Sequence, residues 1–101
     1  CPRTHAYFGH EPHRWRDMLR AGVNVCFGTD SLASAPSLSI LEELRHVAQA
    51  APDCPASTLL ESATLRAATA LNVASRIGSL PAGKDGVVLA VPWSSDGARA
   101  D

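Results

Sequence analysis

Few cysteines and no long apolar run occur in this sequence, and both shortages exclude classes of protein. The three cysteines are dispersed, and no two of them form a CxxC pair. They are too few for a disulfide framework or a structural zinc site, and they predict a reducing, cytoplasmic compartment. Apolar runs stay far below the roughly 20 residues that a membrane helix needs, so no membrane-spanning helix is predicted.

Charge of one sign is also scarce. Nine basic and ten acidic residues are well mixed and give a formal net charge of −1. Nucleic acid or an anionic membrane surface would select a basic face, so neither is predicted as a partner. The 101 residues suffice for one small domain, and 46% of them are apolar, which is enough for a packed core. Because the chain begins with Cys1 and not with methionine, we expect further residues upstream in the natural protein.

The hydrophobic periodicity predicts helical segments alternating with two short strands, which defines an α/β fold class. Apolar residues three and four apart, together with a Ser39–Glu42 capping box, indicate a helix over 39–50. Gly22 and Asn72 suit the left-handed positions that end two other helices. The predicted order is a loop over 1–10, a helix over 11–21, a strand over 23–27, a helix over 39–50, a helix over 57–71 that breaks near Thr64, and a strand over 87–91.

The two predicted strands lack partners within the chain. Residues 23–27 (VNVCF) are β-branched and almost wholly apolar, which is typical of a strand buried on both faces of a parallel sheet. Two short strands cannot supply both faces of such a sheet. We therefore expect that the strand over 23–27 pairs with strands outside this chain, and that the chain is a fragment of a larger protein.

The sharpest chemical feature is Gly-Thr-Asp-Ser at the end of the predicted strand. Catalytic groups of α/β barrels gather at strand ends, and a carboxylate fixed there suits a metal ligand or a general base. Asp30 is therefore the candidate catalytic and metal-binding residue, and the hydroxyls of Thr29 and Ser31 are expected to orient its carboxylate. The alternative interpretation is an Asx turn that merely joins the strand to the next helix.

Three histidines near the N-terminus form a second candidate cluster. His10 and His13 flank the start of the predicted helix over 11–21, and His5 precedes them. One interpretation makes these residues a metal-storage or metal-sensing site. The other makes them ordinary surface histidines, since a zinc site usually needs three or four regularly spaced ligands.

Five motifs follow one another along the chain: residues 1–5 (CPRTH), 21–34 (AGVNVCFGTDSLAS), 41–45 (LEELR), 63–68 (ATLRAA) and 77–84 (IGSLPAGK). In this order they make the chain resemble the amidohydrolase superfamily, in particular its cytosine deaminase and chlorohydrolase branch. The resemblance runs from about Cys1 to Val91. It departs from the family pattern at Thr4-His5, where Ser-Asn is common, at Asp85-Gly86, where Ala-Asp is usual, and at Asn72, where glycine is common.

This resemblance implies a fold and a division of the chain. Residues 1–76 would form the C-terminal part of a (β/α)8 TIM barrel, with the Cys-Pro loop after its seventh strand and Asp30 after its eighth. Residues 77–92 would return to a small β-sandwich as one strand, and residues 93–101 would form a tail.

The resemblance also implies an activity. In the family, a divalent metal is held by histidines of the first, fifth and sixth strands and by the aspartate after the eighth, the role that falls here to Asp30. Zinc or iron is expected, and manganese also accepts such ligands. His5 and His10 would face the substrate. The reaction would be hydrolytic deamination or dechlorination of a purine-, pyrimidine- or triazine-like ring, with Asp30 as proton shuttle.

The upstream histidines are absent from these residues, so we expect the isolated chain to be inactive and the full-length protein to be the hydrolase. Its expected partner is a small-molecule substrate, and the sequence leaves open whether it forms a homo-oligomer. The alternative of another class is a non-catalytic α/β interaction module. Such a module would bind a protein partner through the edge of 23–27 and its apolar helix stripes.

Overall fold

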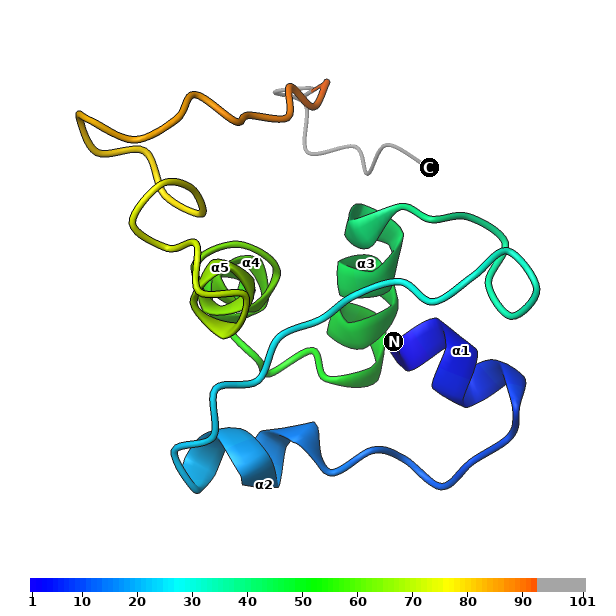
Figure 1. Cartoon of the computed structure of the whole chain (residues 1–101). Helices are drawn as coiled ribbons and strands as arrows, with labels where there is room; N and C mark the ends of the chain where they lie inside the picture. The colour runs from blue at the N-terminus through cyan, green and yellow to red at the C-terminus, as the bar shows by residue number, and fades with distance from the viewer. Residues whose placement is uncertain (93–101) are drawn as a thin grey trace.

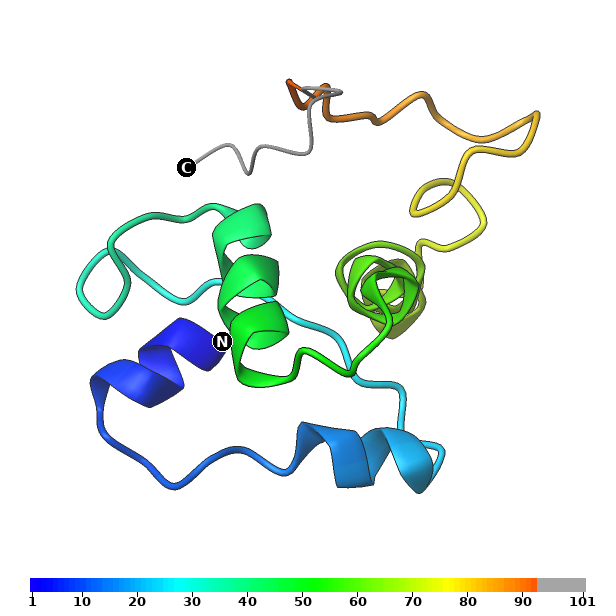
Figure 2. The same ribbon diagram turned by 180° about the vertical axis from the view of Figure 1, so that it is seen from behind.

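The computed structural model describes residues 1–92, and within them it contains five helices. The longest, α3, lies between α1 and α4, and α5 continues beyond α4 (Figures 1 and 2). None of these helices is long and apolar enough to cross a membrane. The bounds are α1, Pro2–Tyr7; α2, Trp15–Arg20; α3, Ile40–Ala50; α4, Ala56–Ala63; and α5, Leu65–Ala70.

The helix predicted over 39–50 is confirmed, together with its N-terminal cap. The Ser39 side chain accepts a hydrogen bond from the backbone N–H of Glu42 at 3.4 Å. This bond satisfies one of the unpaired donors of the first turn, and two glutamates in that turn complement the positive end of the helix dipole. The sequence therefore determines where α3 begins.

The predicted break in the following helix is also confirmed. Thr64 ends α4 and precedes α5, with non-helical backbone angles of φ −124° and ψ −93°. After α5, Asn72 adopts the predicted left-handed conformation with φ 57°. Helix α4 begins after Pro55, so Thr58 lies inside the helix, where its carbonyl accepts from the Ser62 hydroxyl at 2.9 Å.

Two predictions near the N-terminus are wrong in their boundaries. The loop expected over residues 1–10 contains α1, Pro2–Tyr7, because Pro2 has the backbone angle of a first helical turn and the Cys1 carbonyl accepts from the His5 N–H at 3.0 Å. The helix predicted over 11–21 is shortened to α2. Pro12 disfavours helical geometry in the residue before it, so the segment stays irregular up to Arg14.

The strands predicted over 23–27 and 87–91 are not formed among residues 1–92. A strand exists only when a neighbouring strand pairs with its backbone, and neither segment has such a neighbour in this part of the chain. Residues 23–27 contact the helices instead: the Phe27 N–H donates to the Ser62 carbonyl at 3.2 Å, and the Asn24 amide donates to the Arg66 carbonyl at 2.9 Å. The barrel and the sandwich are therefore not seen in the described residues, and the predicted tail over 93–101 lies outside them.

A small core holds the helices together. Phe27, Leu44, Val47 and Leu59 are buried, and Trp15 packs edge-on against Phe27 with ring centroids 5.4 Å apart. Each such side chain contributes about 1.5–3 kcal/mol when it is fully buried. Between the end of α5 and residue 92 the chain extends away from this core in both views, and Val87, Val88 and Leu89 are exposed (Figures 1 and 2).

Gly78 packs tightly against α5 and supports the first stability prediction. Its φ is +89°, and a Cβ atom there would lie 2.7 Å from the Ala68 Cβ and 3.1 Å from the Leu65 Cα. We expect Gly78→Ala to lower the free energy of unfolding by about 2–4 kcal/mol, from left-handed strain plus overpacking. Urea unfolding of the chain, followed by circular dichroism, measures this loss.

The matched control is Gly83→Ala. Gly83 has nearly the same φ, +90°, but a Cβ atom at this position would have no neighbour within 4 Å. The substitution should therefore cost only the backbone strain of about 1 kcal/mol. Equal losses in the two variants would show that the contact of Gly78 with α5 is not what makes the glycine necessary.

Candidate functional site

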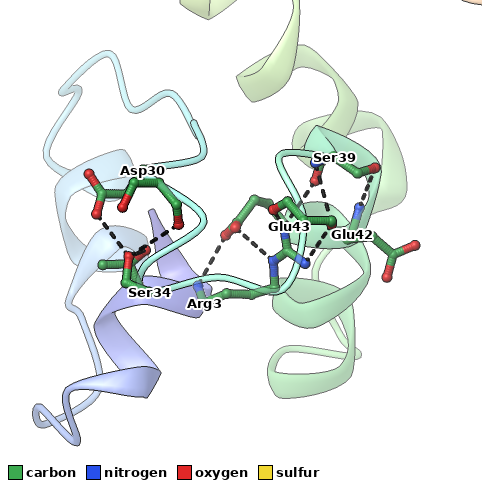
Figure 3. Close-up of polar contacts among 9 residues, drawn as sticks. Arg3, Asp30, Ser34, Ser39, Glu42 and Glu43 are labelled. Carbon is green, nitrogen blue, oxygen red and sulfur yellow. Dashed lines mark hydrogen bonds and ion pairs between the residues drawn. The ribbon is translucent and has the colours of Figure 1, made fainter.

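Asp30 lies on the loop that leads from residues 23–27 into α3, and its side chain is exposed. One carboxylate oxygen, Oδ2, accepts a hydrogen bond from the Ser34 hydroxyl at 2.9 Å (Figure 3). Ser34 itself is only 5% exposed. Among residues 1–92 the other oxygen, Oδ1, makes no hydrogen bond. Asp30 thus has one oxygen held by the protein and one directed to a ligand or to solvent.

Ser34 connects Asp30 to the first helix. Its hydroxyl lies 2.9 Å from the Thr4 hydroxyl of α1, and the Ser31 carbonyl is 3.5 Å away. Neither Ser34 nor Thr4 is among the site residues predicted from the sequence. Ser34 could have been identified from its spacing, because it stands four residues after Asp30. Thr4 could not, because it lies 30 residues before Ser34 in the sequence.

The predicted orienting residues lie on the same loop with other contacts. The Ser31 hydroxyl accepts from the Ala33 N–H at 3.3 Å, which stabilises the turn after Asp30. Thr29 is partly buried beside the aspartate, and no side-chain hydrogen bond of its own is formed within residues 1–92. Their proposed influence on the Asp30 carboxylate stays a prediction.

A buried ion pair anchors the far end of the same loop. The Arg3 Nε lies 2.7 Å from the Glu43 Oε1, and the Arg3 backbone N–H donates to Oε2 at 3.0 Å. The guanidinium also donates to the Ser37 hydroxyl at 3.1 Å and to the Ser37 carbonyl at 2.7 Å (Figure 3). Glu43 is fully buried, and the Arg3 side chain is 11% exposed.

Sequence reasoning missed this ion pair, although a signal existed. Glu43 stands three residues after Ile40 and four before Val47, so it lies on the apolar stripe of α3. A glutamate on such a face is rarely buried without a partner. The pattern predicts that Glu43 has a cationic partner but does not identify Arg3, which lies 40 residues earlier.

The predicted histidines gather, but not around Asp30. The His5 ring centroid lies 5.1 Å from that of His10 and 5.6 Å from that of His13. They border a cavity of about 570 Å³, which Asp30 does not line. Its lining comprises Cys1, Pro2, His5, Ala6, His10, Pro12, His13, Trp15, Arg16, Val25, Cys26, Phe27, His46, Val47, Ala50 and Ala51.

At the rim of this cavity, Arg16 pairs with Asp53. The hydrogen bond from Arg16 and its charge lower the pKa of the Asp53 carboxyl. Both side chains are substantially exposed, so solvent screens the pair and it adds little to stability.

Metal ligands do not form a set in the described part of the chain. No three histidine, cysteine, aspartate or glutamate side chains of residues 1–92 are arranged to hold a metal ion. The interpretation of His5, His10 and His13 as a metal-storage site is therefore wrong for these residues, and His5 Nε2 instead lies 2.5 Å from the Glu11 carbonyl. Asp30 fits the role of one ligand, an anionic oxygen donor with a free position, but a catalytic metal needs about three protein ligands.

Comparisons with known proteins show the family of the chain. The model of the Amidohydrolase family matches residues 1–97. A 5-methylthioadenosine/S-adenosylhomocysteine deaminase of Saccharophagus degradans is 36% identical over 80 residues, which are 72% of this chain and 18% of that protein. One of the same name from Desulforudis audaxviator is 45% identical over 74 residues, 66% of this chain and 17% of that protein.

One further relative has a different name: it is an aminodeoxyfutalosine deaminase of Deinococcus radiodurans. It is 33% identical over 63 residues, 62% of this chain and 15% of that protein. The chain thus spans about a fifth of the length of the curated relatives that it matches. No solved structure shows a significant match to it.

Proposed function

The chain belongs to the amidohydrolase family, and from that premise we propose that it is part of a hydrolase that removes an amino group from a small heterocyclic substrate. One observation carries the proposal. Within residues 1–97, which the family model matches, the Gly-Thr-Asp-Ser loop presents an exposed carboxylate with a single hydrogen bond. Family membership also favours the enzyme over the non-catalytic interaction module.

The names of the relatives narrow the substrate class that we propose. Several are named for deamination of 5-methylthioadenosine and S-adenosylhomocysteine, and one for deamination of aminodeoxyfutalosine. We therefore propose deamination rather than dechlorination, and an adenosine-type substrate before a pyrimidine or a triazine. In the net reaction, water replaces the exocyclic amine of the ring, and ammonia leaves.

Asp30 is proposed to act as the carboxylate of a divalent-metal site. A bound divalent ion of this kind would lower the pKa of water to about 7, which would supply a nucleophile at neutral pH. The Asp30 carboxylate would accept a proton from the attacking water and return it to the departing amine. The carboxylate suits both tasks because Ser34 fixes Oδ2 and leaves Oδ1 available.

The remaining ligands would come from residues outside this chain. We propose that residues 1–76 are the last part of a (β/α)8 barrel, that residues 77–92 return toward a small sandwich, and that residues 23–27 become a strand when neighbouring strands pair with them. The backbone of residues 23–27 pairs with no strand within residues 1–92, which supports this proposal. His5 on α1 and His10 in the segment that follows it are proposed to reach the substrate.

An ammonia-release assay tests the proposed function. The full-length protein is incubated with 5-methylthioadenosine, S-adenosylhomocysteine, cytosine and an aminotriazine, and ammonia is measured by a coupled assay. We expect kcat/KM for one of the adenosine-type compounds to exceed that for cytosine and for the triazine by at least about tenfold, which one or two specific ring contacts supply. Preferential turnover of the triazine or of a chlorinated ring, or no ammonia from any compound, would refute the proposal.

A further inference from the structure

The Ser34 hydroxyl is buried and has three oxygen neighbours, yet it carries a single proton. Those neighbours are the Asp30 Oδ2 at 2.9 Å, the Thr4 Oγ1 at 2.9 Å and the Ser31 carbonyl at 3.5 Å. A hydrogen bond to an ionised carboxylate is stronger than one to a neutral acceptor. The proton therefore goes to the short contact with Asp30 and not to the long one with Ser31.

This assignment fixes the direction of the remaining contact. Because the Ser34 proton is given to Asp30, the contact between Ser34 and Thr4 is satisfied only when the Thr4 hydroxyl donates. The result is a directed chain in which Thr4 donates to Ser34 and Ser34 donates to the Asp30 carboxylate. Successive hydrogen bonds of this kind polarise one another, so the chain is stronger than two separate bonds.

Helix α1 holds the Asp30 loop at a second point as well. Arg3, the neighbour of Thr4, donates to the Ser37 hydroxyl and carbonyl and to the Ser39 carbonyl at 3.3 Å (Figure 3). The loop is thus held by Thr4 near its middle and by the preceding residue, Arg3, near its end. Arg3 is in turn fixed by the buried carboxylate of Glu43.

From this arrangement we propose that Ser34 and Thr4 are positioning residues for the Asp30 carboxylate. They hold Oδ2 in one orientation and leave Oδ1 without a hydrogen bond among residues 1–92. This inference rests on the proposed function for its effect on turnover, but its structural part is independent of it. Thr29 and Ser31 would have smaller effects on the orientation of Asp30 than Ser34 has.

Two readouts test the proposal. In the full-length protein, Ser34→Ala should lower kcat about 10–100-fold, the usual loss when a residue that orients a ligand is removed, while KM changes little. Thr4→Val should lower kcat by a smaller factor, because Ser34 can still donate to Asp30. Ser34→Thr and Thr4→Ser, which keep the hydroxyls, should restore most of the rate.

The second readout is the side-chain rotamer of Asp30, measured in the 101-residue chain by three-bond NMR couplings. One rotamer should dominate in the wild type, and Ser34→Ala should give averaged couplings. The matched control is Ser57→Ala, which removes an exposed hydroxyl on α4 and should change neither readout. Circular dichroism identifies any variant that has lost its fold, in which case Thr4→Val decides the outcome.

Different results would overturn the positioning role of Ser34 and Thr4 and the proposed function. Loss of rate together with averaged Asp30 couplings supports the positioning role. Unchanged couplings in both Ser34→Ala and Thr4→Val would overturn it, and so would equal kcat losses in the Ser34→Thr and Ser34→Ala variants. A wild-type protein without deaminase activity would overturn the proposed function, while the couplings would still decide the positioning role.

Discussion

Replacing Glu43 by alanine is expected to lower the free energy of unfolding by about 3–5 kcal/mol, the usual cost of breaking a buried ion pair from one side. The Glu43 carboxylate is fully buried and accepts from both the Arg3 guanidinium and the Arg3 backbone N–H. Its removal leaves the Arg3 cation, which is only 11% exposed, without an anionic partner. Urea unfolding of the chain at room temperature, followed by circular dichroism, measures the loss.

The neighbouring glutamate provides a matched control for this prediction. Glu42 pairs with Arg45 on the exposed face of α3, with side chains that are 43% and 51% exposed. Glu42→Ala should therefore cost less than about 1 kcal/mol, as exposed pairs within one helix do. If the two alanine variants are equally stable, the Arg3–Glu43 pair does not hold α1 against α3.

Changing Asp30 to asparagine is expected to lower kcat of the full-length protein by about 10²–10⁴-fold, the range that a positioned acid–base group contributes. Asparagine keeps the size of the side chain and an oxygen that accepts from Ser34. It removes the negative charge and the ability to carry a proton. Ammonia release from 5-methylthioadenosine measures the effect.

The control for this substitution is Asp85→Asn, which makes the same chemical change at a second exposed aspartate. Asp85 pairs with Arg76 beyond α5 and has no contact with the Asp30 loop. The kcat of the Asp85→Asn enzyme should stay within about twofold of the wild-type value, as is usual for surface substitutions away from a site. An Asp30→Asn enzyme as active as the Asp85→Asn enzyme would remove Asp30 from the chemistry.

The helices that could be predicted from the sequence are those whose ends are marked by a local capping residue. A capping serine determines the start of α3, and Asn72 ends the last helix in the left-handed conformation that its side chain tolerates. Helix α1 has a weaker local signal, since Pro2 suits its first turn but Cys1 makes no side-chain cap. A helix of six residues is marginal by itself, and its stability comes from packing on α3 through Arg3.

The strands and the site show a different limit of prediction from the sequence. Residues 23–27 have the composition of a strand, but pairing depends on a partner backbone that the pattern of one segment does not supply. The Gly-Thr-Asp-Ser sequence predicted the loop that carries Asp30. It did not predict Thr4 or Arg3, because these residues reach the loop only after α1 packs against α3.

We propose that Asp30 is one ligand of a metal site completed by residues outside this chain. The most direct test is the metal content of the dialysed full-length protein, measured by mass spectrometry for the wild type and for Asp30→Asn. We expect a stoichiometric divalent metal in the wild type and a large loss of metal in the variant. Equal metal content in the two proteins, or none in a fully active wild type, would contradict it.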